Sequence, residues 1–229
     1  MKKTFSDPFC HGPPVFSHDA CPACPGCVQA CPVGAISFSP GQKPLLDAGK
    51  CLGCGVCQKA CPKGLVSASH AWDVHAFSRD GLMAWTGEKT TDVPLASLCP
   101  LTARCLALLD LKRCACMTTA KLLSPWLESM GHYGVQWTED PQEAEAVIIF
   151  GPVFAEMQEP IQAYLGESKG RFLVAAGACA ISGGVSAAEG ARGIGDILKA
   201  DLFVAGCPPS VASLALALAR LFSGKRNAR

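Results

Sequence analysis

The sequence has little charge and no long apolar run. Asp, Glu, Lys and Arg together make up 17% of the 229 residues, and the formal net charge is +1. Binding of nucleic acid through phosphate contacts needs clustered Lys and Arg, so no nucleic-acid role is expected. A bilayer-spanning helix needs about 20 apolar residues. The longest apolar helix candidate, residues 211–222, is too short to span a bilayer. Because charged residues are few, we predict a chain that buries apolar surface against partner proteins.

The sequence is also expected to contain neither a signal peptide nor a nucleotide-binding motif. In the opening stretch MKKTFSDPFC, Asp7 and Pro8 stand where a secretion signal needs its apolar run, and no twin-arginine pair precedes them. We therefore expect a cytoplasmic chain. The stretch GARGIGD from Gly190 does not open a long helix directly after a strong strand, so dinucleotide binding is not expected. Five scattered histidines and no Ser/His/Asp arrangement predict no catalytic centre in the chain itself.

Cysteine, in contrast, is abundant, with 15 residues. An odd count, in a chain that is not a short secreted domain, argues against a disulfide framework. Binding of metal ions or iron–sulfur clusters explains the cysteines better.

Two stretches repeat the pattern C-x2-C-x2-C-x3-C-P, namely CPACPGCVQACP at 21–32 and CLGCGVCQKACP at 51–62. Three closely spaced cysteines let a tight loop wrap one side of a 4Fe-4S cluster, and in this pattern the fourth cysteine binds the other cluster. The predicted ligands of the first cluster are Cys21, Cys24, Cys27 and Cys61. Those of the second cluster are Cys51, Cys54, Cys57 and Cys31.

The repeat continues beyond the ligands. After Pro32 and Pro62, which turn the chain away, come VGAISF and KGLVSA, each a glycine turn that leads into a β-prone run. The repeat resembles the bacterial two-cluster ferredoxin family over residues 17–70. Structural zinc is the alternative, but zinc sites use separated C-x2-C pairs, and zinc does not explain the doubled motif. A chain with clusters is brown, whereas a zinc protein is colourless.

Apolar residues in the segment 67–100 recur with neither the helix period nor the strand period. This segment is predicted to form an irregular connector with room for one short helix. His70 and His75 in this segment are predicted to be surface or packed side chains rather than ligands. The cysteines without an assigned role are Cys10, Cys99 and Cys105. The predicted domains are a two-cluster ferredoxin domain at 1–70, a connector at 71–103 and a second domain at 104–229.

From Cys105 onward, short apolar runs alternate with helical stretches. Continuous apolar runs of this length are typical of buried parallel strands. The predicted strands are 105–110, 146–150, 171–176 and 201–205, and the predicted helices are 118–131, 154–166 and 209–222. The pattern predicts a doubly wound α/β domain with right-handed crossovers.

Four further cysteines follow three of these strands. They are Cys114, Cys116, Cys179 and Cys207. The carboxyl ends of parallel strands meet at one edge of a sheet, where loops from different strands converge on one crevice. Four thiols at one edge predict a third 4Fe-4S cluster. For any single cysteine, the alternative is a small buried core residue.

The segments AVIIFGPV, GACAISGG and GCPP resemble the small, cluster-bearing subunit shared by energy-converting nickel-iron hydrogenases and respiratory complex I, where it is the 20 kDa subunit, over residues 104–222. The resemblance implies a flavodoxin-like fold. It also places Cys114, Cys116, Cys179 and Cys207 as ligands of the 4Fe-4S cluster nearest the catalytic partner. Two departures stand out. RCAC gives C-x-C, where the hydrogenase branch has C-x-x-C and the complex I branch has adjacent cysteines, and Ser210 and Val211 stand where the family has arginine and proline.

The resemblance implies an electron-transfer subunit of a membrane-associated hydrogenase-like complex, of the formate hydrogenlyase or energy-converting type, with three 4Fe-4S clusters. The implied partners are a large catalytic subunit, membrane subunits of the same complex and a soluble electron donor or acceptor. The chain itself is expected only to transfer electrons. It is expected to lie at the cytoplasmic face of the inner membrane through its partners.

Three alternatives stay open. One is the small subunit of a soluble cytoplasmic nickel-iron hydrogenase, although in such enzymes the ferredoxin module usually follows the small-subunit domain. Another is a complex I-like, quinone-linked relative. The third is a non-catalytic assembly or sensor protein, an alternative supported by the RCAC pair and the missing arginine.

Overall fold

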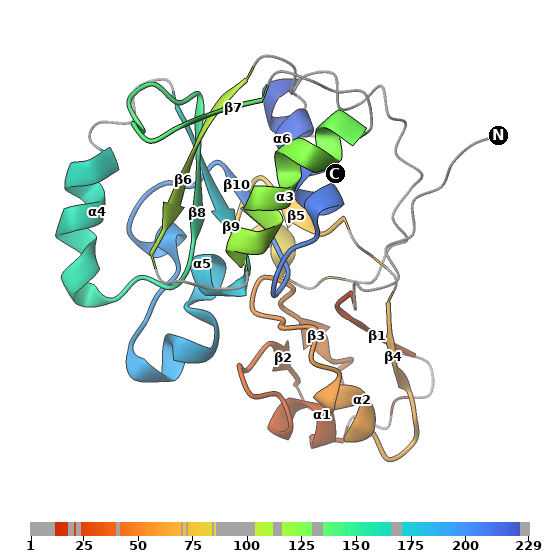
Figure 1. The fold of residues 1–229 in the computed structure, drawn as a ribbon. Coiled ribbons are helices and arrows are strands. Elements are labelled where there is room, and N and C mark those ends of the chain that lie inside the picture. Colours follow the sequence, from red (N-terminus) through yellow and green to blue (C-terminus); the bar gives the residue numbers. More distant parts are fainter. Residues whose placement is uncertain are drawn as a thin grey trace.

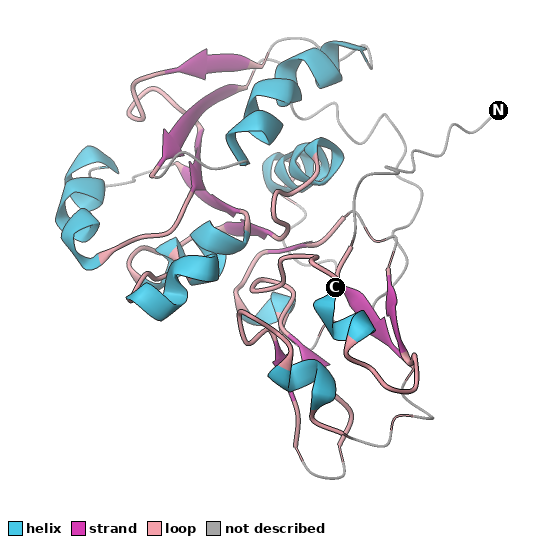
Figure 2. Cartoon of the chain, turned by 60° about the horizontal axis from the view of Figure 1, so that its bottom comes forward, coloured by secondary structure: helices cyan, strands magenta, loops and turns pink. Residues whose placement is uncertain are grey.

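The computed structural model (Figure 1) describes residues 12–17, 21, 24–39, 42–69, 71, 73–83, 85, 104–111, 116–129, 135–165 and 171–224. The predicted residues Cys10, His70, Cys99 and Cys114 lie outside these ranges. A small N-terminal part with short elements lies beside a larger α/β domain (Figures 1 and 2). Within the described residues, no helix is both long and apolar enough to cross a bilayer.

The N-terminal part is built from two small antiparallel strand pairs and two short helices. Its elements are β1 (Pro14–Phe16), α1 (Gly26–Gln29), β2 (Ile36–Ser37), β3 (Leu45–Leu46), α2 (Val56–Lys59) and β4 (Val66–Ala68). β2 and β4 lie in the β-prone runs predicted after Pro32 and Pro62. They pair with separate partners, β2 with β3 and β4 with β1. Phe16, Leu46 and Val66 pack there with the buried Cys27 and Cys57.

A six-stranded sheet forms the larger domain. Its strands are β5 (His75–Ala76), β6 (Cys105–Asp110), β7 (Gln136–Thr138), β8 (Ala146–Phe150), β9 (Phe172–Ala176) and β10 (Leu202–Val204). The spatial order is β5-β10-β9-β8-β6-β7, and all pairs are parallel except β5 with β10. The chain passes from β6 outward to β7 and then returns to β8 on the other side of β6. The sheet is therefore doubly wound, with its switch point between β6 and β8.

The four strands predicted from continuous apolar runs are present as β6, β8, β9 and β10. The sequence does not predict β7 or β5. β7 has three residues, of which two are exposed, so it forms no apolar run. β5 has two residues and lies within the segment expected to be an irregular connector.

Helices cover both faces of the sheet (Figure 2). α3 (Cys116–Ser129) and α6 (Val211–Phe222) share a core with one face, and α4 (Gln158–Leu165) and α5 (Ala178–Ser182) share a core with the other. Successive strand residues alternate between these cores. In β8, for example, Ile148 faces α3 and α6, whereas Val147 faces α4 and α5. The 3-10 helices within the described residues are η2 (Asp80–Leu82), η4 (Ala155–Met157), η5 (Gly184–Glu189) and η6 (Ile194–Asp196).

The N-terminal part and the sheet domain are joined through residues 73–85. This segment contributes β5 to the sheet and η2 beside it, so part of the expected connector packs into the fold. Ala48 N donates to Leu82 O at 2.8 Å, and Trp85 N donates to Leu46 O at 3.0 Å. Ala48 and Leu82 also belong to the core that includes α4 and α5. Main-chain hydrogen bonds and apolar contacts therefore hold the two parts together.

Candidate metal centres

The cysteines of the repeated motif surround two cavities. A cavity of about 200 Å³ is lined by Cys31, Cys51, Cys54 and Cys57. A smaller cavity is lined by Cys21, Cys24, Cys27 and Cys61. Each cavity takes three cysteines from one copy of the motif and the fourth from the other copy. This grouping is the same as that of the two predicted ligand sets, and ligation by these sets stays a prediction.

The grouping follows from the short helices that the two motifs form. Each of α1 and α2 spans four residues, and the two helices contact each other. Cys31 and Cys61 come two residues after these helices. Each of them lines the cavity of the neighbouring motif. Gly55, the N-cap residue directly before α2, has φ 72°, a left-handed conformation that glycine adopts without steric cost. That turn connects Cys54 with the buried Cys57.

Backbone N–H groups point at three of these sulfurs. Ala35 N donates to Cys31 Sγ at 3.2 Å, and Leu65 N donates to Cys61 Sγ at 3.3 Å. These two bonds occupy the same place in the two copies of the motif, four residues after the last cysteine. Gly53 N donates to Cys51 Sγ at 3.4 Å. Hydrogen bonds to ligand sulfurs stabilise negative charge there and tune the potential of a cluster.

Burial works against negative charge on three sulfurs of the two sets. It raises the pKa of the Cys51 thiol to about 11; the N–H of Gly53 opposes this rise, and the nearby sulfurs of the same set add to it. Burial also raises the pKa of Cys27 and Cys57. Backbone N–H donors, that of Leu65 first, lower the pKa of Cys61. Cluster ligands are thiolates, so bound iron has to supply the positive charge that stabilises these buried sulfurs.

The four cysteines of each set line a cavity, and their sulfurs do not converge on a single position. A single zinc ion needs its sulfur ligands at about 2.3 Å from one point. Among the residues that the structure describes, no group of three or more His, Cys, Asp or Glu side chains is placed to hold one metal ion. Four cysteines around one cavity are the donor set that a 4Fe-4S cluster requires, and the chemistry of the residues fits that group.

The three described cysteines of the predicted third set lie at the carboxyl edge of the sheet. Cys116 begins α3, Cys179 lies in α5, and Cys207 follows β10. Ala178 N donates to Gly206 O at 2.9 Å, which ties the turn before Cys179 to the turn before Cys207. The fourth predicted ligand, Cys114, lies outside the described residues.

Glycines make room for sulfur at this edge. A Cβ at Gly177 would lie 2.7 Å from Cys116 Sγ, and a Cβ at Gly184 would lie 2.6 Å from Cys179 Sγ. Any side chain at either position would therefore displace a cysteine. Cys116 is buried and Cys207 is exposed, so the site reaches from the interior to the surface. The structure brings three cysteine-bearing segments together, as a third cluster site requires.

Other residues considered in the sequence lie apart from these sites. His75, predicted not to be a ligand, has Nδ1 2.6 Å from Asp73 Oδ1 and Nε2 2.9 Å from Arg220 Nη1. Cys105 begins β6 at the opposite edge of the sheet, and burial raises its pKa. The sequence gives no signal for the Asp47–Arg79 ion pair, because its members are 32 positions apart and belong to no motif.

Comparison with known proteins finds similarity in two separate parts of the chain. A family model described as "NADH ubiquinone oxidoreductase, 20 Kd subunit" matches residues 108–221, and one described as "4Fe-4S dicluster domain" matches residues 20–65. An NADH-quinone oxidoreductase subunit from Geobacter metallireducens is 34% identical over 94 residues, which cover 40% of this chain and 55% of that protein. Its counterpart from Citrifermentans bemidjiense is 32% identical over 102 residues, or 44% of this chain and 60% of that protein.

The chain thus spans a little over half of the length of these relatives. Among solved structures, a chain of the membrane-bound sulfane sulfur reductase, an archaeal respiratory membrane complex, superimposes with a TM-score of 0.45 and 16% identity. That match covers 60% of this chain and 78% of the other.

Proposed function

Because the chain contains a 4Fe-4S dicluster domain followed by a domain of the NADH ubiquinone oxidoreductase 20 kDa subunit family, we propose that it relays electrons through three 4Fe-4S clusters to or from a large catalytic partner. The observation that carries the proposal is the placement of cysteines. Two sets of four surround separate cavities, and three more cysteine-bearing segments meet at the carboxyl edge of the sheet.

Each cluster has proposed ligands in this chain. The two ferredoxin-type clusters are held by the two four-cysteine sets that line the cavities. The third is held by Cys116, Cys179 and Cys207, with Cys114 as the fourth predicted ligand. When bound, a 4Fe-4S cluster accepts and donates one electron at a time. The chain contributes sulfur ligands, backbone N–H donors to sulfur and a fixed spacing of the sites.

The third site is the proposed contact with the catalytic partner. Its Cys207 is exposed, and Val185, in the 3-10 helix η5 that follows Cys179, has 63% of its surface exposed. A partner protein that covers this edge would bury both residues and exclude water from the cluster. We place the partner in a membrane-associated hydrogenase-like complex of the formate hydrogenlyase or energy-converting type. In that complex the chain lies at the cytoplasmic face and exchanges electrons with a soluble carrier.

A complex I-like, quinone-linked assembly is the second candidate. It is favoured by the names of the relatives, which are NADH-quinone oxidoreductase subunits. The two candidates differ in the metal content of the partner, because a hydrogenase partner carries nickel and a quinone-linked partner does not.

Purification of the complex separates these candidates. The tagged full chain is isolated from its native host without oxygen, the co-purifying proteins are identified, and nickel, iron and sulfide are measured. A large subunit with stoichiometric nickel, together with integral membrane proteins, is the expected result. Membrane partners without nickel would support the second candidate. A chain that purifies alone with its clusters would contradict both candidates and favour a non-catalytic assembly or sensor role.

A further inference from the structure

The N-terminal part and the sheet domain meet at a cavity of about 350 Å³. On one side, Cys51, Leu52 and Gly53 line it; on the other side, Gly206 and Cys207 do. A predicted ligand of a ferredoxin-type cluster and a predicted ligand of the third cluster therefore share one cavity. This juxtaposition joins residues that are far apart in the sequence and that belong to different domains of the chain.

The other ferredoxin-type site has no such contact. Every residue that lines its cavity lies between Phe16 and Val66, within the N-terminal part. None of its four cysteines, Cys21, Cys24, Cys27 and Cys61, lines the cavity that Cys51 shares with Cys207. The two ferredoxin-type sites are therefore not equivalent relative to the third site, although their motifs have the same spacing.

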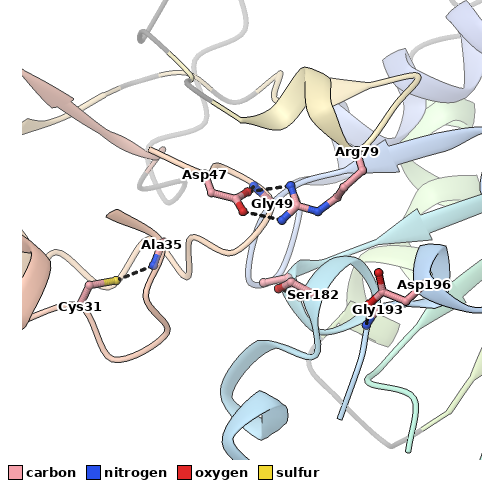
Figure 3. A network of polar contacts seen from close by, with 9 residues as sticks. Cys31, Ala35, Asp47, Gly49, Arg79, Ser182, Gly193 and Asp196 are labelled. Atoms are coloured by element: carbon pink, nitrogen blue, oxygen red, sulfur yellow. Dashed lines mark hydrogen bonds and ion pairs between the residues drawn. The ribbon is translucent and has the colours of Figure 1, made fainter. Parts of the chain in front are cut away.

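An ion pair fixes the loop that leads to Cys51. Arg79, which follows β5, donates through both terminal nitrogens to the carboxylate of Asp47, with Nη1 at 2.8 Å from Oδ1 (Figure 3). The same Oδ1 accepts from Gly49 N at 3.0 Å. The Asp47 side chain is 13% exposed and that of Arg79 is 28% exposed, so the pair is partly shielded from solvent. A two-point arginine–carboxylate contact sets orientation as well as distance.

Close packing at Gly49 presses the same loop against the helix that carries Cys179. A Cβ at Gly49 would lie 2.8 Å from Ile181 Cγ2 and 3.0 Å from Arg79 Nη1. Ile181 belongs to α5, as does Cys179. Only glycine allows this approach of the Cys51 loop to the sheet domain.

We propose that the cluster held by Cys31, Cys51, Cys54 and Cys57 is the one that exchanges electrons with the third cluster, across the cavity shared by Cys51 and Cys207. The cluster of the other set then takes the outer position and exchanges electrons with the soluble carrier. Asp47, Gly49 and Arg79 are positioning residues for this step. In each transfer one cluster loses one electron and the other gains it, and no bond forms or breaks. This inference rests on the proposed function.

Magnetic coupling between clusters tests the order. The full chain is loaded with iron and sulfide, reduced without oxygen, and the spin relaxation of the third cluster is measured by pulsed EPR. Two matched double variants each remove one ferredoxin-type cluster through the second and third cysteines of its motif. They are Cys54→Ala with Cys57→Ala, and Cys24→Ala with Cys27→Ala.

The first double variant is expected to slow the relaxation of the third-cluster signal several-fold, because its nearest paramagnetic neighbour is gone. The second double variant is expected to leave that relaxation unchanged. The reverse pattern, or equal effects of the two variants, would overturn the inference.

If a double variant does not fold, the inference can still be tested with a variant that keeps all cluster ligands. Gly49→Leu forces the Cys51 loop away from α5 and is expected to weaken the coupling while iron and sulfide content stay constant. Gly64→Asn is the control, because a Cβ there meets no atom within 4 Å and asparagine tolerates the left-handed φ of 63°. Unchanged coupling in Gly49→Leu with full cluster content would contradict the inference. Iron and sulfide for two clusters only, without a third signal, would instead refute the proposed function on which the inference rests.

Discussion

At the scale of single residues, glycines leave the space that the cysteine sulfurs of the third site occupy. Gly177 and Gly184 lie directly beside the sulfurs of Cys116 and Cys179, and both have a positive φ. A Cβ at either position would occupy the space of a sulfur atom. We therefore expect the third site to depend on these glycines as strongly as on its ligands.

The substitution Gly177→Ala tests this dependence. Its Cβ would collide with Cys116 Sγ, so we expect loss of the third cluster and retention of the two ferredoxin-type clusters. Gly190→Ala is the matched control, since Gly190 has a similar φ of 89° but no atom within 4 Å of its Cβ. Both substitutions place a side chain on a strained backbone, at about 1–3 kcal/mol. Iron and sulfide analysis with EPR distinguishes them, and equal cluster content in the two variants would contradict the account.

The sequence could predict which cysteines group around each cavity, but not all the residues that contact the cysteine-bearing loops. Fixed spacing within each motif groups its first three cysteines, because local chain geometry determines that these sulfurs face a common cavity. The fourth member of each set comes from the repeat of the motif, whose pattern assigns the last cysteine of each copy to the other cluster. The partners of the Cys51 loop could not be predicted in this way. Asp47 and Arg79 come into contact only after the chain has folded. In the sequence, this aspartate and this arginine look like ordinary charged surface residues.

At the scale of elements, long apolar runs were predictive and short strands were not. β8 is buried at every residue, and the sequence AVIIF predicts it directly. β5 and β7 have two and three residues, and their pairing depends on neighbours that are distant in the sequence. β5 matters most, because it fixes the segment that carries Arg79 onto the edge of the sheet beside β10.

A buried network joins β5 to the C-terminal helix α6. The guanidinium of Arg220 has no acceptor atom, so its Nη1 donates to His75 Nε2 at 2.9 Å and to Asp73 Oδ2 at 3.0 Å. His75 Nδ1–H then donates to Asp73 Oδ1 at 2.6 Å. The Asp73 side chain is 2% exposed, so these partners replace water around its carboxylate oxygens.

Removal of the arginine should destabilise the fold. Arg220→Ala leaves the Asp73 carboxylate buried without its cation, and we expect a loss of about 3 kcal/mol in the free energy of unfolding. Arg104→Ala breaks a more exposed ion pair with Glu145 and is expected to cost about 1 kcal/mol. Urea unfolding followed by tryptophan fluorescence measures both. A loss for Arg220→Ala no larger than that for the control would show that the network contributes little.

At the scale of the whole molecule, covalent fusion changes the kinetics of electron transfer. A ferredoxin-type module that finds its acceptor by diffusion reacts at a rate set by the concentrations of the two proteins. A module linked covalently to its acceptor is instead present at a high effective concentration at the acceptor site. Here the described part of the connector is also packed, since its Leu82 joins the core of the sheet domain together with Ala48 of the N-terminal part. The two parts are therefore expected to act as one unit.

This arrangement predicts a first-order internal step. After rapid reduction of the outer cluster by a soluble reductant, electron arrival at the third cluster is followed by stopped-flow spectroscopy. The rate constant is expected not to change when the concentration of the protein is varied widely at constant excess of reductant. A rate proportional to the concentration of the protein would mean that electrons pass between molecules, contrary to the packed arrangement.

The central claim is that this chain holds three clusters, the third of them at the edge of the sheet. The most direct measurement is cluster content by iron and sulfide analysis and EPR in the full chain and in Cys179→Ser, with Cys105→Ser as the control at the opposite edge. The account predicts three clusters in the full chain and in the control, and loss of the third signal alone in Cys179→Ser. Identical signals in all three proteins would contradict it.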